Sequence, residues 1–207
     1  MPTDNFIPTE ANHIVDGIYQ TTIAGLLFSA SQKHIDHRGH YAELVRLPDL
    51  NSALKKPFVP VQINHSHSHA NVIRGFHAEN WNKLVTIVHG YCYCVLVDVR
   101  PKSQTFGQSV SLNLGNHDDA LYGSLFIPAG VANSALALSE PVDYLYFVDA
   151  LYADRDRSGD ISISLFDQDI NVQWPIAKKS MIVSERDRHS VSLRAKFPEK
   201  FGAKNTT

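Results

Sequence analysis

The pattern of apolar and polar positions along this 207-residue chain predicts mainly β-strands. Short runs rich in Val, Ile, Leu, Tyr and Phe are separated by Gly, Pro, Asn and Asp, which is typical of an antiparallel sandwich or barrel. The clearest strand candidates are residues 84–88, 91–99, 109–114, 124–127, 134–138 and 143–149, and the weaker ones are residues 42–47 and 59–64. The chain is therefore expected to be an all-β protein.

Few segments show helical periodicity, and only residues 23–31 and 50–55 suggest short helices. His89 and Gly90 separate two strand candidates and predict a tight hairpin turn between them. No linker, repeat or low-complexity block interrupts the chain, so we expect one domain over residues 1–207. Its core should span about residues 17–187, and the small, polar residues 197–207 should form a flexible tail.

Composition and charge narrow the classes of function. Hydrophobic residues make up 43% of the chain, and the formal net charge is −2, so nothing suggests binding to nucleic acid or to a membrane surface. No apolar run reaches the ~18 residues of a membrane helix, and residues 1–16 do not resemble a secretory signal. With Cys92 and Cys94 interpreted as two small core residues, we expect a cytoplasmic protein.

The chain has eleven histidines, which makes metal binding or proton chemistry worth testing. His65, His67 and His69 alternate along one predicted strand, so the simplest interpretation is one partly exposed strand face, with a binding surface or a metal site as alternatives. A metal-dependent cupin could use His67, His69, Glu79 and His77. The later Pro-x-Gly strand, however, carries Asn133 where such a site needs another histidine, and Asn is a poor ligand for the softer divalent metals.

A longer series of motifs gives a more specific hypothesis. In chain order they are Asp36-x-Arg38-Gly39 with Glu43, Gln62-x-Asn64, Arg74-Gly-x-His77, Lys83-Leu-Val, Val97-Asp-x-Arg100, Ser103-x-Thr-Phe-Gly107, Pro128-x-Gly130, Tyr146, Asp167, Trp174-Pro175 and Ser184-Glu-Arg-Asp187. This order resembles the dTDP-4-dehydrorhamnose 3,5-epimerase family over about residues 17–187. Each motif alone is weak, but their order is a strong signal.

The resemblance implies a cupin-type double-stranded β-helix, or jelly roll, with short peripheral helices. It also implies a homodimer that needs no metal and no cofactor. The substrates of the family are nucleoside-diphosphate 4-keto-6-deoxy sugars, with dTDP as the expected nucleotide and GDP or CDP as alternatives. The reaction would invert C3, C5 or both carbons of the sugar, as part of deoxysugar or polysaccharide biosynthesis.

The resemblance also assigns roles to individual residues. It implies that His77 is the base, that Asp167 orients His77, and that Tyr146 donates a proton on the opposite face of the sugar. Lys83 and Arg74 would stabilise the enolate and the phosphates. The remaining substrate contacts are assigned to Arg38, Glu43, Gln62, Asn64 and Asn133, some of them reaching in from a partner subunit.

These residue types suit inversion of a carbon next to a ketone. An imidazole removes the α-proton because its ordinary pKa lies near neutrality, and a carboxylate on its second nitrogen fixes the tautomer. A cation stabilises the enolate, and a tyrosine can return a proton. Asp98 and Arg100 are expected to form a structural pair rather than a catalytic one.

Three positions depart from the pattern of the rhamnose enzymes. Ala78 replaces a tyrosine, Asn133 replaces a histidine, and Cys94 replaces an aspartate. The loop after His77 borders the sugar, so a different sugar is expected. One inversion, at C3 or C5 alone, is as plausible as two. A metal-dependent cupin enzyme and a non-catalytic cupin that binds sugar nucleotides remain the alternatives.

Overall fold

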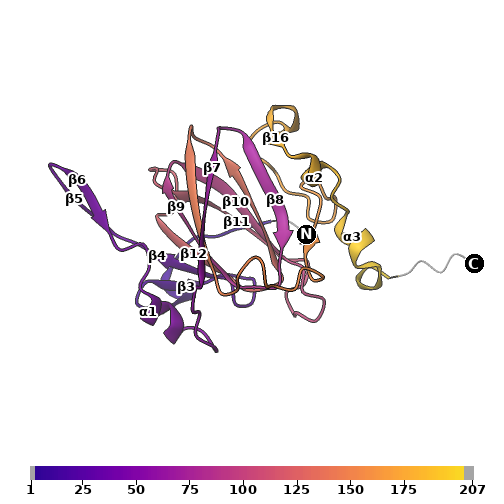
Figure 1. Cartoon of the computed structure of the whole chain (residues 1–207), viewed down its shortest axis with the longest axis horizontal. Helices are drawn as coiled ribbons and strands as arrows, with labels where there is room; N and C mark the ends of the chain where they lie inside the picture. The colour runs from indigo at the N-terminus through magenta and orange to yellow at the C-terminus, as the bar shows by residue number, and fades with distance from the viewer. Residues whose placement is uncertain (1–2, 203–207) are drawn as a thin grey trace, which may run out of the picture.

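Two sheets that face each other form the body of the computed structural model, which describes residues 3–202 (Figure 1). The first sheet has the spatial order β1 (Asp4–Asn5), β11 (Ser109–Gly115), β10 (Tyr91–Asp98), β13 (Val131–Ala137), β8 (Val72–Ala78) and β15 (Ile161–Ser162), and β16 (Ile182–Val183) also pairs with β8. The second has the order β2 (His13–Val15), β3 (Ile18–Gln20), β4 (Leu27–Ala30), β12 (Gly123–Ile127), β9 (Lys83–His89), β14 (Val142–Val148) and β7 (Gln62–Ser68).

The remaining elements are small and lie around this body. A separate two-stranded sheet pairs β5 (Lys33–Asp36) with β6 (Gly39–Ala42) and projects away from the sandwich (Figure 1). The short α-helices are α1 (Leu47–Ser52), α2 (Glu185–Arg188) and α3 (Leu193–Lys196), and the 3-10 helices are Glu10–Asn12, Lys178–Ser180 and Pro198–Lys200. In the part of the chain that the structure describes, no helix is long and apolar enough to cross a membrane.

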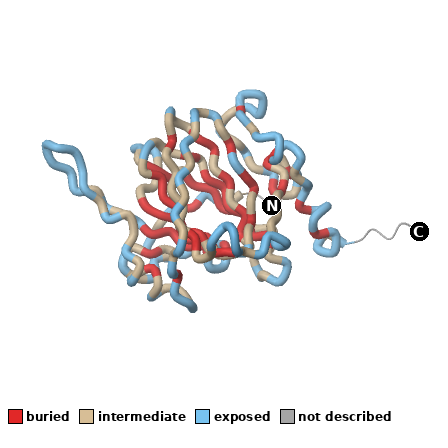
Figure 2. Tube along the Cα trace, in the orientation of Figure 1, coloured by how far each residue is buried: buried red, intermediate tan, exposed pale blue. Residues whose placement is uncertain are grey.

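The main hydrophobic core lies between the two sheets, where both contribute alternate residues (Figure 2). Val85 and Ile87 of β9 face Cys92, Cys94 and Leu96 of β10 in this core. Burial raises the pKa of the Cys92 thiol to about 12, so the thiol stays protonated and behaves as a small core side chain. The all-β jelly roll with short peripheral helices that the sequence predicts is confirmed.

The predicted pairing of β9 with β10 is wrong, although both strands exist. β9 pairs with β12 and β14, whereas β10 pairs with β11 and β13. The His89-Gly90 turn therefore carries the chain from one sheet to the other. Gly90 has a φ of +70°, and a Cβ there would lie 2.5 Å from the Pro141 carbonyl oxygen, so this crossover requires glycine.

Three other local features also differ from what the sequence predicts. Residues 23–31 contain strand β4 rather than a helix, because Phe28 faces the main core while Leu27 packs on the opposite side of the sheet. The weak strand candidate at residues 42–47 is mostly a connection between β6 and α1. Strand β8, which carries His77, was not predicted because Arg74, Gly75 and His77 interrupt its apolar pattern.

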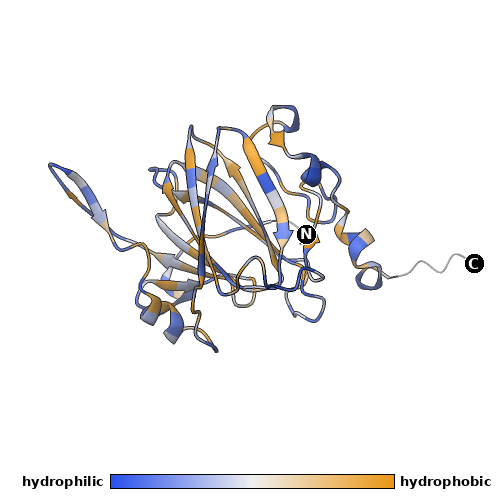
Figure 3. Ribbon diagram, viewed as in Figure 1, coloured by the Kyte–Doolittle hydropathy of each residue, from blue (hydrophilic) through white to orange (hydrophobic). Residues whose placement is uncertain are grey.

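The C-terminal segment covers the outer face of the first sheet. Phe76, Val95 and Leu136 on that face pack with Leu193 and Phe197 in a second core, and apolar residues recur along this segment (Figure 3). Phe197 is buried and meets Phe106 edge-to-face, so the first part of the predicted flexible tail is packed instead. Residues 203–207 of that tail lie outside the described residues.

Asp98 forms the structural pair with Arg100 that the sequence predicts, at the end of β10. Its fully buried carboxylate accepts hydrogen bonds from Arg100 Nε at 2.7 Å, from Ser103 Oγ at 2.5 Å and from Thr105 Oγ1. Burial by itself would raise the pKa of Asp98, but these hydrogen bonds outweigh it and the pKa is lowered.

We predict that Asp98→Asn destabilises the protein by about 1.5–3 kcal/mol at pH 7, the usual value of hydrogen bonds to a charged group. Since the pKa of Asp98 is lowered on folding, the carboxylate stabilises the fold above the pKa of ~3.9 of an unfolded Asp. That contribution is lost as the pH falls through the lowered pKa of the folded state. Urea unfolding at several pH values should show the difference between wild type and variant shrinking toward acid, and a constant difference would contradict this.

Candidate active site

The predicted catalytic side chains converge between the two sheets because strand alternation points them to the same interior space. Lys83 shares the inner face of β9 with Val85, and Tyr146 shares the inner face of β14 with Val142. From the other sheet, His77 of β8 is paired with Asn133 of β13. This interior space is the candidate active site.

His77 is held by a carboxylate of the C-terminal segment. Its Nε2 lies 2.6 Å from Oδ1 of Asp187 in α2, and the side chain of Asp187 is only 4% exposed. Burial tends to raise the pKa of Asp187, but hydrogen bonds with His77, Ser184 and the Gly75 backbone outweigh it, so the pKa is lowered. Asp187 is thus an anion that fixes the tautomer of His77 and leaves Nδ1 as the nitrogen that can accept a proton.

A β-bulge places Arg74 and His77 on the same side of β8. Asn133 and Ala135 are neighbouring inward positions of β13, two residues apart. Their partners His77 and Arg74 are three residues apart, so β8 contains one extra residue between these two pairs. The residue within this bulge must be glycine, because a Cβ on Gly75 would lie 2.7 Å from the Asn133 carbonyl oxygen. The close packing of β8 against β13 therefore explains why the Arg-Gly-x-His motif has a glycine at this position.

The role predicted for Asp167 is wrong. Its carboxylate accepts hydrogen bonds from the backbone N–H groups of Asp169 at 2.8 Å, of Ile170 at 3.1 Å and of Leu193 at 2.6 Å. Asp167 therefore fastens the C-terminal segment, and Asp187 is the partner of His77. The signal was present in Ser184-Glu-Arg-Asp187, where Ser184 caps the short helix that presents the carboxylate.

Lys83 is a buried cation with two polar partners. Its Nζ forms an ion pair with Glu79 and donates a hydrogen bond to Asn133 Oδ1 at 2.5 Å. Burial lowers the pKa of Lys83, and the negative charge of Glu79 opposes that effect. The sequence did not predict that Glu79 forms an ion pair with Lys83. Its carboxylate supplies the negative charge next to Lys83.

Tyr146 keeps its proton at neutral pH. Burial raises the pKa of its phenol, the charge of Glu79 raises it further, and the charge of Arg74 opposes them. Arg74 belongs to β8 and Glu79 directly follows it, so the phenol lies near the strand that carries the base. A protonated phenol in this position can donate a proton to a carbanion.

Asn64 and Gln62 extend the site along the neighbouring strand β7. Asn64 is paired directly with Tyr146, so both side chains lie on the inner face. Gln62 donates a hydrogen bond to Asn64 Oδ1 at 2.7 Å, while Asn64 Nδ2 is buried with no hydrogen-bond partner among the described residues. A buried donor without a partner is unfavourable, so Asn64 Nδ2 is suited to bind a ligand acceptor.

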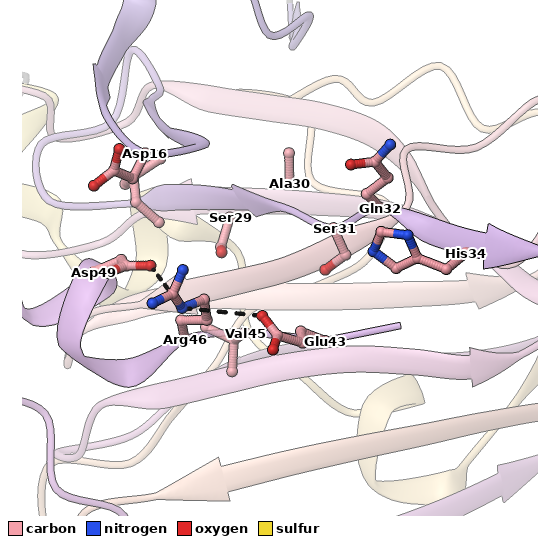
Figure 4. A pocket seen from close by; sticks show the side chains of 11 residues that line it. Asp16, Ser29, Ala30, Ser31, Gln32, His34, Glu43, Val45, Arg46 and Asp49 are labelled. Atoms are coloured by element: carbon pink, nitrogen blue, oxygen red, sulfur yellow. Dashed lines mark ion pairs between the residues drawn. The ribbon is translucent and has the colours of Figure 1, made fainter. Parts of the chain in front are cut away.

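Arg38 and Glu43 are not brought to His77 within one chain. Arg38 is at the tip of the β5–β6 hairpin, where it pairs with Asp36 at 2.6 Å and is 78% exposed. Glu43 lies at the base of this hairpin and lines a small pocket with His34, Arg46 and Asp49 (Figure 4). This pocket contains none of the residues predicted for catalysis.

The ligand set of the alternative metal-dependent cupin does not converge. His67 and His69 point away from the interior on β7, where their side chains are 52% and 74% exposed. Glu79 is paired with Lys83 inside the sandwich, and His77 is paired with Asp187. The four residues therefore lie on different sides of the sheets, and that hypothesis is wrong for this set.

Comparison with known proteins agrees with the fold and the motifs. The sequence model of the family described as dTDP-4-dehydrorhamnose 3,5-epimerase matches residues 20–195. The dTDP-4-dehydrorhamnose 3,5-epimerase of Shigella flexneri is 30% identical over 174 residues, which cover 82% of this chain and 92% of that protein.

Two solved structures show the same similarity in three dimensions. The dTDP-6-deoxy-D-glucose-3,5-epimerase of Legionella pneumophila, in complex with dTDP-4-keto-L-rhamnose, has a TM-score of 0.76 at 28% identity and covers 88% of this chain and 95% of that one. A 3'-monoepimerase of Streptomyces bikiniensis, in complex with dTDP-quinovose, has a TM-score of 0.75 at 26% identity, covering 87% and 89%.

These findings define a cupin-type isomerase that acts as an epimerase. The chain belongs to the dTDP-4-dehydrorhamnose 3,5-epimerase family. The resemblance derived from the motifs is thereby confirmed.

Proposed function

We propose that this protein inverts C3, C5 or both carbons of a dTDP-linked 4-keto-6-deoxy sugar, in deoxysugar biosynthesis. The observation that carries the proposal is the convergence of the His77–Asp187 pair, Lys83 and the protonated Tyr146 on one interior space. A base and an acid on facing sheets can act on opposite faces of a sugar held between them, as inversion requires.

Each step of the reaction has a group in this space. His77 removes the proton from the carbon next to the ketone, and Asp187 stabilises the imidazolium that forms. The electrons move into the C4 carbonyl, and the oxyanion is stabilised by the positive charge of Lys83, with Arg74 nearby. Tyr146 then donates its proton to the carbon from the other face, and the carbonyl re-forms. His77 releases its proton to solvent, and solvent returns a proton to the phenolate.

Binding of the nucleotide sugar rests on polar side chains around the base. Asn64 Nδ2, buried and without a partner among residues 3–202, can donate to an acceptor of the substrate. Asn133, fixed by Lys83, lies opposite His77 and can contact the sugar. The relatives bound to dTDP-sugars favour dTDP, and GDP and CDP remain the alternatives to be tested.

A homodimer would bring Arg38 and Glu43 to the site of the partner. The β5–β6 hairpin stands apart from the sandwich and exposes Ile35 by 77% and Tyr41 by 66%. An isolated two-stranded hairpin is only marginally stable in water, so this arm is suited to dock on a second subunit. Arg38 at its tip could then contact the diphosphate bound by the other chain.

Hydrogen exchange tests the proposed reaction. The protein should be incubated with dTDP-4-keto-6-deoxyglucose in D2O, and the protons on C3 and C5 should be followed by NMR. Deuterium uptake with product formation, also after treatment with EDTA, is the expected result. Substitution of GDP or CDP for dTDP tests the nucleotide. Absence of exchange with all three nucleotides would refute the proposal, and binding without exchange would indicate the non-catalytic alternative.

Tyr146→Phe should separate proton removal from inversion. Because His77 remains, the variant should still exchange the α-proton with solvent, while formation of the inverted product falls by about 10²–10⁴-fold, the usual contribution of a general acid. NMR measures both rates in the same D2O sample. Equal losses of exchange and inversion would instead indicate that Tyr146 helps to bind the substrate. Tyr91→Phe, at the start of β10 where the ring stacks on His117 away from the site, is the matched control.

Mixing two inactive variants tests the partner contact of Arg38. Arg38→Ala and His77→Ala should each be nearly inactive, but a mixed dimer has one site with both wild-type residues. Random mixing makes half of the dimers mixed, so activity should return to about one quarter of the wild-type value. No recovery from mixtures that were unfolded and refolded together would contradict a shared site.

A further inference from the structure

A group of histidines on the outside of β7 has no role in the site described above. Strand alternation divides β7 into an inner row with Gln62 and Asn64 and an outer row with His65, His67 and His69. The strand is the edge of its sheet, and all three rings are more than half exposed. This outer face therefore needs an explanation separate from epimerisation.

His65 and His67 converge on one carboxylate of the neighbouring strand. Asp143 of β14 is directly opposite His67 in the register, and its Oδ1 lies 2.8 Å from His65 Nε2 and 2.8 Å from His67 Nδ1. One ligand atom from each of the three residues lies within 4.8 Å of the others. Among residues 3–202 this is the group of histidine, cysteine and acidic side chains with the spacing of a metal site.

The donor set is that of a transition-metal site. Two imidazole nitrogens and one carboxylate oxygen suit Zn²⁺ and also Ni²⁺, Cu²⁺ or Co²⁺, at bond lengths of about 2.0–2.2 Å. An ion entering between the three side chains would replace their mutual hydrogen bonds, and the partial exposure of the rings allows the small rotations that this needs.

His69 provides a contrast within the same row. Its Nδ1 lies 2.6 Å from Oε1 of Glu140, and this carboxylate also accepts a hydrogen bond from the backbone N–H of Ala70. His69 thus has a single carboxylate partner, and that carboxylate is already hydrogen-bonded to the backbone. This is an ordinary surface pair. The group of His65, His67 and Asp143 differs because two rings share one carboxylate oxygen across two strands.

We propose that His65, His67 and Asp143 form a site for a divalent transition-metal ion of the Zn²⁺ class, on the outer face of the β7–β14 pair. The site is structural rather than catalytic, since it lies on the opposite side of β7 from Asn64. A bound ion would clamp the edge strand to β14 and so hold Gln62 and Asn64 in place on the inner face.

Calorimetric titration of the full-length protein with ZnCl2 tests this site. The protein should carry no added histidine tag and should first be treated with EDTA and dialysed. We expect one ion to bind per chain and the melting temperature to rise with the zinc concentration. Because removal of a ligand should cost at least as much as removal of its outer hydrogen-bond partner, His65→Ala, His67→Ala and Asp143→Asn should each weaken binding by at least about tenfold.

His69→Ala is the matched control, because it removes an exposed histidine from the same strand face. It should change zinc affinity by less than the three site variants do, and the circular dichroism spectra of all four variants should match wild type. No binding at millimolar zinc, equal binding by wild type and the site variants, or an equal loss in His69→Ala would each overturn the proposal. Exchange activity after EDTA treatment is a separate readout, so failure of this site leaves the epimerase assignment untouched.

Discussion

Replacing His77 with alanine should slow exchange of the α-proton by about 10²–10⁴-fold, the contribution of a well-placed general base. The loss should appear in kcat more than in KM, because the imidazole acts on the reacting carbon and other residues provide most of the binding energy. NMR of the substrate in D2O measures the exchange directly. Retention of wild-type exchange by His77→Ala would show that another group is the base.

Two aspartates provide a sharper test of the same assignment. Asp187→Asn should lower kcat strongly and change its pH profile, because the amide cannot stabilise the His77 imidazolium and can favour the wrong tautomer. Asp167→Asn should instead lower the unfolding free energy, since Asp167 binds three backbone N–H groups and does not contact His77. Comparison of pH–rate profiles and urea unfolding for both variants distinguishes the roles, and the opposite result would restore Asp167 as the catalytic partner.

Lys83→Met should reduce kcat by about 10²–10³-fold, the usual effect of removing a group that stabilises a developing oxyanion. Lys83 is 5% exposed, so its charge acts on the enolate with little screening by water. Steady-state kinetics with the 4-keto substrate measures the effect. The double variant Lys83→Met with Glu79→Gln avoids an unpaired buried carboxylate and should be just as slow. Lys102→Met, at an exposed position, should be unchanged.

The single variant Glu79→Gln should shift the pH profile in a defined direction. Burial lowers the pKa of Lys83 and Glu79 opposes that effect, so removing the carboxylate should lower the pKa further. Activity that requires the charged ammonium is then lost at a lower pH. The alkaline limb of the kcat profile should therefore move toward neutrality, and an unmoved limb would show that Glu79 does not control the charge of Lys83.

Part of the site followed from the sequence because the motifs are local. The glycine in Arg74-Gly-x-His77 is required locally, since Gly75 allows the close approach to β13 that puts both polar side chains on the same side of β8. Lys83 begins strand β9, whose residues 83–87 are all buried, so only the structure places its side chain on the inner face. Family resemblance supplied the chemical roles of His77, Lys83 and Tyr146.

The pairings of Asp187 with His77 and of Glu79 with Lys83 could not be predicted from the sequence. The carboxylate beside His77 lies 110 positions further along the chain, and its approach depends on how the C-terminal segment packs over the first sheet. Glu79 is near Lys83 in sequence, but its pairing depends on β8 and β9 lying in different sheets that face each other. Pairings between sheets leave no periodic signal in the chain.

The sequence by itself determined that this chain is an all-β enzyme of the epimerase family, and that His77 is the histidine to test first. Its eleven histidines drew attention to the run from His65 to His69, and alternation already placed those rings together on one strand face. Only the tertiary structure decided that this face points outward, beside Asp143, while Asn64 points toward Tyr146. The physical reason is that side-chain direction along a strand is a local property, whereas the side of the strand that meets the other sheet is set by packing of the whole sandwich.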